Sequence, residues 1–463
     1  MNTQKYVLGV DIGTSSVKIC VVDYQTLKPV DFKSIPCLAK VSSNHPKGNE
    51  QNVITIFEAF VKCLSAFPEN LLNQVYSIGV CGQMHGIVFW NEQFVSNFWN
   101  NGLKLKICNS VSNLYTWQDA RVDLTFLKKL PKPESHLNIY SGYGCSTIFW
   151  LKENELDIFN QYTYCGTVQD LIVSILCNRK DSIMSTHNAA SWGYFNVING
   201  SWNKNILERV NFPVHFLPQV VPPGNIAGTL FKSLYGLQKG TMIGVALGDL
   251  QCSVLATSPI ETDAVINIST SAQIAFITKH TEHVFGSIEY FPFFQNYFLV
   301  VAASLNGGNV LDIFVNSILN WIVSLGLSIT KEDLWSQLLK SSSEEYINTS
   351  LIVSPLMMAE RHDPLTYGSL MNITSENLTI NQMFTGICQG IVKNLYKMMP
   401  KEILIKENIQ QIIGTGSVLT NNVVIKQEIQ KLYELPLNIK VTGDAAFGAA
   451  LSMMNEVLLV NIK

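Results

Sequence analysis

Charged residues are scarce in this sequence, and the two signs almost cancel. The 463 residues contain 32 Lys and Arg against 35 Asp and Glu, which gives a formal net charge of −3. Nucleic acids and anionic membrane surfaces attract proteins that carry a basic surplus. The composition therefore argues against a nucleic-acid partner and against a membrane partner.

Paired cysteines and long apolar runs are also missing. None of the ten cysteines is spaced as Cys-x-x-Cys, the pattern typical of zinc sites and redox motifs. No apolar run approaches the roughly 18 residues that a bilayer-spanning helix needs. Because the first apolar run begins at Tyr6, we expect no signal peptide. These observations predict a soluble, reduced, cytoplasmic protein.

Two widespread phosphate-binding motifs are absent. The sequence has no GxxxxGK[ST] motif, so no P-loop is indicated, and the Gly-Thr-Gly turn at 414–416 lacks the third glycine of a dinucleotide fingerprint. Hydrophobic residues nevertheless make up 47% of the chain, which is enough for a large core. A chain of this length predicts two domains. We place them at 1–255 and 256–463, with the boundary in a helix near Ala256.

What the sequence does contain is a strand–turn–strand pattern at Tyr6–Asp23. β-branched residues dominate both strands, and Gly13 permits a backbone conformation that a Cβ would obstruct. Thr14 and Ser15 can offer N–H and O–H groups to an anion, and Asp11 ends the first strand, where a carboxylate can meet a hydrated metal ion. The pattern suits the terminal phosphates of a nucleotide; an ordinary hairpin is the alternative.

The same pattern recurs about 255 residues later, which indicates an internal duplication. Residues 263–277 predict a second strand–turn–strand element, with Ser-Thr-Ser at 269–271 in place of Gly-Thr-Ser at 13–15. One hydroxyl-rich turn is common, whereas two at matching positions in two halves are harder to explain by chance. Each half would contribute one phosphate-facing hairpin to a cleft.

Glycines precede two predicted helices of the second half. Gly307 and Gly308 stand before a helix at 310–325, and a Gly-Thr-Gly-Ser turn at 414–417 stands before a helix at 421–433. Glycines at a helix N-terminus allow a backbone to approach an anion closely. Each signal is weak in isolation.

Polar residues end two predicted strands of the first half. GQMHG at 82–86 follows a strand at 75–80, and Asp249 follows a strand at 242–247 and begins a helix. Side chains at such strand ends suit ligand contact. His85 could instead be a satisfied structural histidine, and Asp249 could be a helix N-cap rather than a general base.

Three further segments are ambiguous. Thr116–Arg121 predicts the start of an amphipathic helix that runs to Leu130; Trp117 and Asp119 in it suit either a sugar site or a core anchor with a cap. The aromatic cluster at 189–195 suits core packing or the wall of a pocket. Polar residues predict a surface loop at 341–348, and charged ones predict a salt-bridged turn at 360–364.

Taken together, these motifs resemble the FGGY family of carbohydrate kinases, within the actin-like ATPase superfamily. The resemblance spans essentially the whole chain and rests on DIGTSSVK, GQMHG, TWQDAR, GD at 248–249, NISTSAQ, SLNGGN and GTGSVLTNN. GQMHG and the Trp-x-Asp-x-Arg pattern are most similar to the ketose kinases of the family. The resemblance implies an α/β fold of two actin-like ATPase (ribonuclease H-like) domains around a central cleft.

The resemblance also implies an activity and a set of site residues. The activity is ATP-dependent phosphorylation of a ketose that feeds the pentose phosphate pathway. A seven-carbon ketose is the preferred substrate, and a pentulose is the alternative. Asp249 would be the general base, and Asp11 would hold hydrated Mg²⁺. The ketose would contact Gln83, Met84, His85, Trp117, Asp119 and Asp249. ATP would contact Thr14, Ser15, Lys18, Thr270, Gly307, Gly308, Gly414, Gly416, Ser417 and Asn421.

Three positions depart from the family pattern. Ser269 replaces a common glycine, so its side chain would take part in phosphate contact. Leu250 follows Asp249 where the pentulose kinases carry a polar amide, which disfavours a pentulose. Ala359 replaces another glycine, with little expected consequence. A non-catalytic ATP switch is the alternative function, and the presence of both Asp11 and Asp249 argues against it.

Overall fold

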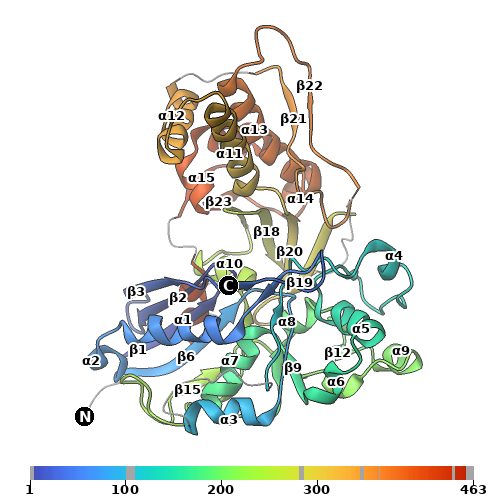
Figure 1. The fold of residues 1–463 in the computed structure, drawn as a ribbon. Coiled ribbons are helices and arrows are strands. Elements are labelled where there is room, and N and C mark those ends of the chain that lie inside the picture. The colour runs from blue at the N-terminus through green and yellow to red at the C-terminus, as the bar shows by residue number, and fades with distance from the viewer. Residues whose placement is uncertain are drawn as a thin grey trace. The chain divides into compact units, whose positions relative to one another are not determined.

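The computed structural model describes residues 5–100, 110–280, 286–344, 349–363, 365–440 and 444–454. The chain divides into two compact units, and in each of them helices pack on a β-sheet (Figure 1). The first unit comprises Met1–Ser258, Phe291–Phe298 and Gly443–Lys463, and the second comprises Pro259–Tyr290 and Leu299–Thr442. Among the described residues, no helix combines the length and the apolar character that crossing a membrane requires.

The first unit is built on a seven-stranded sheet in the order β14-β15-β6-β1-β2-β3, with β16 paired to β6. The central strand β1 runs antiparallel to β2 and parallel to β6. Both β1 and β6 are almost entirely buried, as their apolar runs predict. The strands are Tyr6–Ile12 (β1), Ser16–Asp23 (β2), Pro29–Pro36 (β3), Val75–Gly82 (β6), Ile226–Thr229 (β14), Met242–Gly244 (β15) and Leu247–Gly248 (β16).

Helices cover both faces of this sheet. Gly9 and Gly79 are register partners on β1 and β6, and an added Cβ at either would collide with the backbone of α17. Gly82 points to the opposite face, where Gln169 of α7 lies, because successive residues of a strand face opposite sides. The helices packed on this sheet are Val53–Ser65 (α1), Val168–Cys177 (α7), Asp249–Ala256 (α10) and Ala445–Leu451 (α17).

Local capping signals explain where α1 and α7 begin. The Asn52 side chain accepts a hydrogen bond from the backbone of α1, and Thr167 with Asp170 forms a reciprocal capping box at the start of α7. α7 accordingly begins at Val168, directly after the cap residue Thr167.

Short elements form the rest of the first unit, in small sheets of the order β4-β5-β8, β7-β9, β10-β13 and β11-β12. Their strands are Lys40–Val41 (β4), Glu50–Gln51 (β5), Val88–Trp90 (β7), Leu114–Tyr115 (β8), Tyr164–Gly166 (β9), Ile183–Ser185 (β10), Phe195–Asn196 (β11), Ser201–Trp202 (β12) and Gln219–Val221 (β13). Their helices are Glu69–Leu72 (α2), Glu92–Asn100 (α3), Leu124–Leu127 (α4), Gly144–Asn154 (α5), Ile158–Gln161 (α6), Thr186–Ala190 (α8), Lys204–Arg209 (α9) and the 3₁₀ turn Val214–Phe216.

The second unit has a six-stranded sheet in the order β19-β20-β18-β17-β23-β24 and a separate hairpin of β21 and β22. The strands are Asp263–Ile268 (β17), Ala272–Thr278 (β18), Ile288–Pro292 (β19), Phe298–Ser304 (β20), Ile352–Ser354 (β21), Ser369–Met371 (β22), Gln411–Thr415 (β23) and Leu437–Ile439 (β24). The helices are Gly308–Ser324 (α11), Lys331–Glu344 (α12), Ile380–Met398 (α13), Lys401–Lys406 (α14), Ser417–Asn421 (α15) and Val423–Tyr433 (α16).

The two sheets repeat one topology. The order β3-β2-β1-β6-β15 in the first unit matches β20-β18-β17-β23-β24 in the second. In both, the central strand (β1 or β17) pairs antiparallel with the next strand of the chain (β2 or β18) and parallel with the strand on its other side (β6 or β23). The duplication predicted from the two strand–turn–strand patterns is therefore present in the fold.

Several sequence-based boundaries are wrong. Residues 117–122 form turns, and the helix predicted from Thr116 to Leu130 shrinks to α4, which Asp123 caps. The strand predicted at 242–247 breaks into β15 and β16. The loop predicted at 341–348 belongs to α12 as far as Glu344, and 345–348 lie outside the described residues. Unlike the predicted second domain, the second unit excludes α17.

Candidate active site

Three charged side chains surround the end of β1 in the first unit. Lys18 Nζ lies 3.6 Å from Asp11 Oδ2 and 3.0 Å from Asp444 Oδ2. Asp11 and Lys18 are register partners on β1 and β2, so the hairpin itself brings them together. Asp444 comes from the N-cap of α17, where its Oδ1 accepts a hydrogen bond from the Ala446 N–H. The sequence analysis missed Asp444; an Asp before a run of small residues was the only signal.

The electrostatics of this group are those of a carboxylate-rich site. Burial raises the pKa of Asp11 from 3.8 to about 7; Lys18 opposes the rise, and the charges of Asp249 and Asp444 add to it. Burial alone would lower the pKa of Lys18, but Asp11 and Asp444 hold it above its ordinary value. One cation therefore faces several carboxylates.

Asp249 lies at the first position of α10, directly after β16. Its Oδ1 accepts a hydrogen bond of 2.8 Å from the Leu250 N–H. Burial raises its pKa from 3.8 to about 6, opposed by that N–H and by Lys18. The carboxyl group is therefore mostly ionised at neutral pH, and it is held on a rigid strand–helix junction, as a general base requires.

The residues predicted to contact sugar and phosphate are partly bonded to one another. Trp117 Nε1 donates to Thr14 Oγ1 at 3.0 Å, and Thr14 Oγ1 lies 3.3 Å from Gln83 Oε1. Gln83 Nε2 donates to Gln51 Oε1, and Gln51 Nε2 donates to the Thr14 carbonyl at 2.7 Å. This network ties the first hairpin to the GQMHG segment. Gln51, which the sequence analysis missed, lies at its centre.

His85 adopts a strained backbone conformation in the GQMHG segment. Its φ is +73°, a region that non-glycine residues rarely occupy and that occurs at functional sites. Its ring stacks on Tyr143 with centroids 4.4 Å apart. Nδ1 lies 2.8 Å from the Ser191 carbonyl, and since a carbonyl only accepts, Nδ1 carries the proton. Met84, one residue earlier, packs beside Gly248 next to Asp249.

Asp119 is committed to a buried ion pair. Its Oδ1 accepts from Arg121 Nε at 2.8 Å, and its Oδ2 accepts from Arg121 Nη2 and from the Asn49 N–H. Asp119 is 1% exposed. Both of its oxygens already bind protein donors, so this geometry favours a positioning role over the predicted sugar contact.

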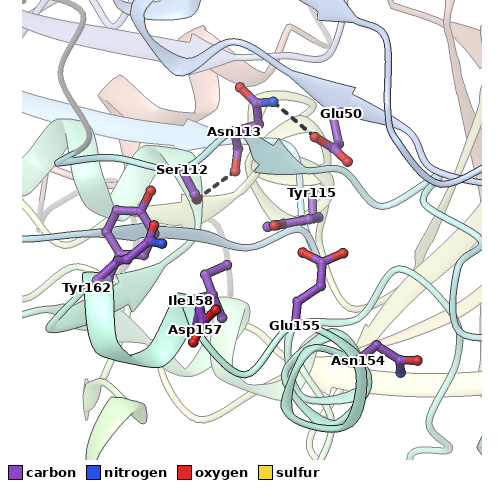
Figure 2. Close-up of a pocket in the computed structure, with 10 residues that line it drawn as sticks. Glu50, Ser112, Asn113, Tyr115, Asn154, Glu155, Asp157, Ile158 and Tyr162 are labelled. Carbon is purple, nitrogen blue, oxygen red and sulfur yellow. Dashed lines mark hydrogen bonds between the residues drawn. The ribbon is translucent and has the colours of Figure 1, made fainter.

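A polar pocket of about 470 Å³ is lined by Glu50 and Glu155 (Figure 2), and both of these carboxylates lie within 4 Å of Arg121. Arg121 Nη2 binds Glu50 Oε1 at 2.6 Å, and Glu50 with Glu155 and Asp157 gives this pocket an acidic lining. None of the predicted site residues lines it. The pocket is therefore distinct from the group of residues around Asp11 and Asp249.

In the second unit, three predicted nucleotide-binding segments converge. The Gly308 N–H donates to the Ser269 carbonyl at 2.8 Å, which fixes the N-terminus of α11 against the second hairpin and its Thr270. An added Cβ at Gly307 would overlap the Ser271 backbone. Gly416 has a φ of +94°, and an added Cβ there would collide with Ile268 in β17. Glycine is thus required at the points where these segments touch.

The remaining nucleotide-site candidates are less uniform. Ser417 begins α15, and Asn421 at its end is exposed, with Nδ2 donating to the Ser417 carbonyl at 2.9 Å. Gly414 lies inside β23 among Leu and Ile side chains, so its placement in the turn was wrong. The Ser269 hydroxyl, for which we predicted phosphate contact, lies 3.0 Å from Asn267 Oδ1.

Glu360 accepts hydrogen bonds in a buried network that the charged residues around it in the sequence did not indicate. The sequence analysis placed it in a salt-bridged turn, and in the structure the side chain is buried, with 3% of it exposed. Its carboxylate accepts from the Ser304 hydroxyl, from the Leu305 N–H at 3.0 Å and from Asn394 Nδ2 at 2.8 Å. Glu360 therefore holds the loop between β20 and α11 through these hydrogen bonds.

Comparison with known proteins identifies the family. The model of the FGGY family of carbohydrate kinases, N-terminal domain, matches residues 6–256. The chain is also 39% identical over 472 residues to a sedoheptulokinase of Mus musculus, covering 99% of each protein. The chain belongs to the FGGY family of carbohydrate kinases. It is therefore a sugar kinase, with ATP as the co-substrate that this family implies.

Two other relatives of this FGGY kinase are more distant. A xylulose kinase of Staphylococcus xylosus is 22% identical over 440 residues, covering 90% of this chain and 84% of the relative. A crystal structure of xylulose kinase from Rhodospirillum rubrum superposes with a TM-score of 0.79 at 16% identity, covering 97% of this chain and 89% of that one. The latter likeness confirms the predicted two-domain actin-like ATPase fold.

Proposed function

We propose that this FGGY kinase phosphorylates sedoheptulose to sedoheptulose 7-phosphate. The identity of 39% to a sedoheptulokinase over the full chain, against 22% to a xylulose kinase, supports a heptulose over a pentulose. Leu250 next to Asp249 gives the same preference a local reason, since an apolar side chain replaces the polar amide of the pentulose kinases. The activity rests on one observation above all: Asp249 stands partly desolvated at a strand–helix junction.

Asp249 is the general base of the proposed reaction. A sugar hydroxyl is a weak acid and a poor nucleophile, so a positioned carboxylate that accepts its proton raises the rate about 10² to 10⁴-fold. Asp249 is suited to this because its pKa of about 6 keeps it ionised at neutral pH. Met84 and His85 orient the ketose. Trp117 and Gln83 support the first hairpin through their contacts with Thr14, and Asp119 holds Arg121.

The residues at the end of β1 fit a hydrated Mg²⁺. Asp11, Asp249 and Asp444 outnumber Lys18, and carboxylate oxygens are the ligands that Mg²⁺ prefers. Among the described residues, no group of three or more His, Cys, Asp and Glu side chains is arranged as a metal site, and Mg²⁺ usually keeps several waters. Asp11 would hold the ion, which when bound neutralises phosphate charge.

The phosphates and the nucleotide are assigned to two sets of residues. Thr14, Ser15 and Lys18 of the first hairpin would contact phosphate oxygens, as would Thr270 of the second. Gly307, Gly308, Gly416, Ser417 and Asn421 would contact the nucleotide through backbone groups or short side chains.

The first test measures sugar-dependent ADP formation with Mg·ATP over sedoheptulose, xylulose, ribulose and glycerol. Preference for sedoheptulose supports the proposal, and preference for xylulose or ribulose replaces the substrate while keeping the mechanism. The Asp249→Asn variant should lose about 10² to 10⁴-fold in kcat and still bind sugar by calorimetry. Asp123→Asn, at another helix start in the same unit, is the matched control. Near-normal turnover of Asp249→Asn would show that the base is assigned wrongly.

A further inference from the structure

The two segments that present His85 and Asp249 leave neighbouring strands at the same edge. β6 ends at Gly82, just before Gln83, Met84 and His85, and β16 ends at Gly248, just before Asp249. Gly248 pairs with Gly82 in the parallel register. The β6–β16 ladder ends at this pair, so other groups must hold the two segments beyond it. One is the Ile12 carbonyl of β1, which accepts from the Gln83 N–H at 3.0 Å.

Gln169 of α7 bridges these two strand ends from the face of the sheet opposite to α17. Its Nε2 lies 3.2 Å from the Gly82 carbonyl, 3.2 Å from the Gln83 carbonyl and 3.5 Å from the Leu247 carbonyl. The side chain is fully buried. An amide nitrogen has two hydrogens, so they are shared among these oxygens, and the two segments are held by one group.

Asn188 extends the bridge to the break in the neighbouring strand. Its Oδ1 lies 3.4 Å from Gln169 Nε2, and its Nδ2 donates to the Ala246 carbonyl at 3.1 Å. Ala246 lies between β15 and β16, where the predicted continuous strand is interrupted.

The segment that contains Asn188 also holds His85. The Ser191 hydroxyl donates to the Asn188 carbonyl at 2.8 Å and accepts from the His85 N–H at 3.3 Å. The Ser191 carbonyl accepts from His85 Nδ1, and Trp192 Nε1 donates to the Gly86 carbonyl at 3.2 Å. A buried chain of hydrogen bonds therefore runs from the GQMHG segment through Ser191, Asn188 and Gln169 to the strand end before Asp249.

We propose that Gln169 and Asn188 are positioning residues that set the spacing between the sugar-orienting His85 segment and the base Asp249. This inference rests on the proposed function of Asp249 and His85. One detail separates it from simple core stabilisation: Gln169 Oε1 has no hydrogen-bond partner among the described residues. An unpaired buried oxygen is unfavourable for folding, so stability alone does not explain an amide at this position. The bonds from its nitrogen, which align the His85 and Asp249 segments, explain it better.

The test replaces Gln169 by Met, which keeps the length of the side chain and removes the donor. Because a misplacement of about 1 Å can cost roughly 10²-fold in rate, Gln169→Met should lower kcat/KM for the ketose about 10 to 100-fold. The KM for ATP should stay within about twofold, since the bridge touches none of the proposed nucleotide contacts. Asn188→Ala should act in the same direction, and the double variant should lose less than the product of the two single losses.

Ser174→Ala is the matched control. Ser174 lies on the same helix, is fully buried and donates to the Asp170 carbonyl at 2.9 Å, but it touches neither strand end. Its kcat/KM per folded molecule should be unchanged. Equal losses per folded molecule in Ser174→Ala and Gln169→Met, or a loss that follows only the folded fraction measured by circular dichroism, would overturn the proposal.

Two precautions keep the outcome decisive. If Gln169→Met does not fold, Gln169→Asn keeps the amide on a shorter side chain, and its kcat/KM for the ketose should still fall while its KM for ATP does not; unchanged kcat/KM in this variant also overturns the proposal. All variants are assayed with whichever sugar the wild type prefers, with Asp249→Asn in parallel. A wrong heptulose assignment or a wrong base is thereby detected separately from a failure of the bridge.

Discussion

The two hairpins share a topology and differ in charge. Asp11 and Lys18 are register partners just before the first turn, and Asn267 and Gln273 are register partners just before the second. An ion pair in one unit therefore corresponds to two neutral amides in the other. The duplicated framework therefore gives both units the same hairpin shape, whereas only the first hairpin carries the charged pair of Asp11 and Lys18.

The copies also agree in how the turns are held. The Cys37 N–H, just after β3, donates to the Ser15 carbonyl at 2.9 Å, and the Asn309 N–H, after β20, donates to the Thr270 carbonyl at 3.0 Å. In each unit the segment after the strand that pairs with the second arm of the hairpin (β3 or β20) is hydrogen-bonded to the turn. One carbonyl of each turn, that of Ser15 or of Thr270, is thereby occupied.

The largest effect on stability should come from a position at which the central strands of the two units carry side chains of different size. Gly9 and Val265 each lie two residues before the register pairs compared above, and an added Cβ at Gly9 would overlap the backbone of α17 at Ala446. Overpacking a core costs 1–3 kcal/mol or more, so Gly9→Ala should lower the free energy of unfolding by about 3 kcal/mol. Urea denaturation measures this change.

Val265→Ala is the comparison in the second unit. Removing methyl groups from this buried side chain, which is 3% exposed, should cost about 1–2 kcal/mol. If Gly9→Ala proved less harmful than Val265→Ala, the close approach of α17 to β1 would be contradicted.

Exchanging Asp and Asn between the two hairpins tests directly whether only the first hairpin needs a carboxylate. Asp11→Asn should lower kcat about 100-fold at fixed Mg²⁺ and raise the Mg²⁺ concentration needed for half-maximal rate. Asn267→Asp places a carboxylate beside the proposed phosphate site, so like-charge repulsion should raise the KM for ATP about tenfold. Steady-state kinetics over a series of Mg²⁺ concentrations measures both effects.

Either exchange could contradict the comparison. Asp11→Asn with an unchanged Mg²⁺ requirement would remove Asp11 from the metal site. Asn267→Asp with an unchanged KM for ATP would separate the second hairpin from the phosphates.

The pH dependence should reveal the base of the first unit. Burial raises the pKa of Asp249 to about 6, so the base is increasingly protonated below that pH, and kcat should fall up to tenfold per pH unit on the acid side. The profile is measured at saturating Mg²⁺, since a bound cation stabilises the ionised form of Asp11. Asp249→Asn should lose this acid limb, and a limb that persists in the variant would belong to another group.

The smallest effect concerns a family glycine that this chain lacks. Ala359 has a φ of +52°, and left-handed backbone is unfavourable for residues with a Cβ. Ala359→Gly should therefore raise the free energy of unfolding by about 0.5–1 kcal/mol. Thermal denaturation checks this, with Ala359→Val as the opposite control, since a β-branched residue tolerates that backbone poorly. A lower melting temperature for Ala359→Gly would contradict the strain.

Local patterns in the sequence determined much of the fold. Local patterns predicted both hairpins and the helices α10 and α11, because periodicity and capping act over only a few residues. The motifs and their order along the chain also predicted the family correctly. Asp11 and Asp249 were placed at the ends of strands, where the structure has them.

Tertiary structure decided what distant segments do to one another. The Lys18–Asp444 contact spans 426 residues, and the polar turn around Glu360 becomes a buried network only when β20 lies beside it. Hydrogen bonds between such segments depend on packing of the whole sheet, which no local period encodes, so the sequence specified the chemical groups and the fold assigned their partners.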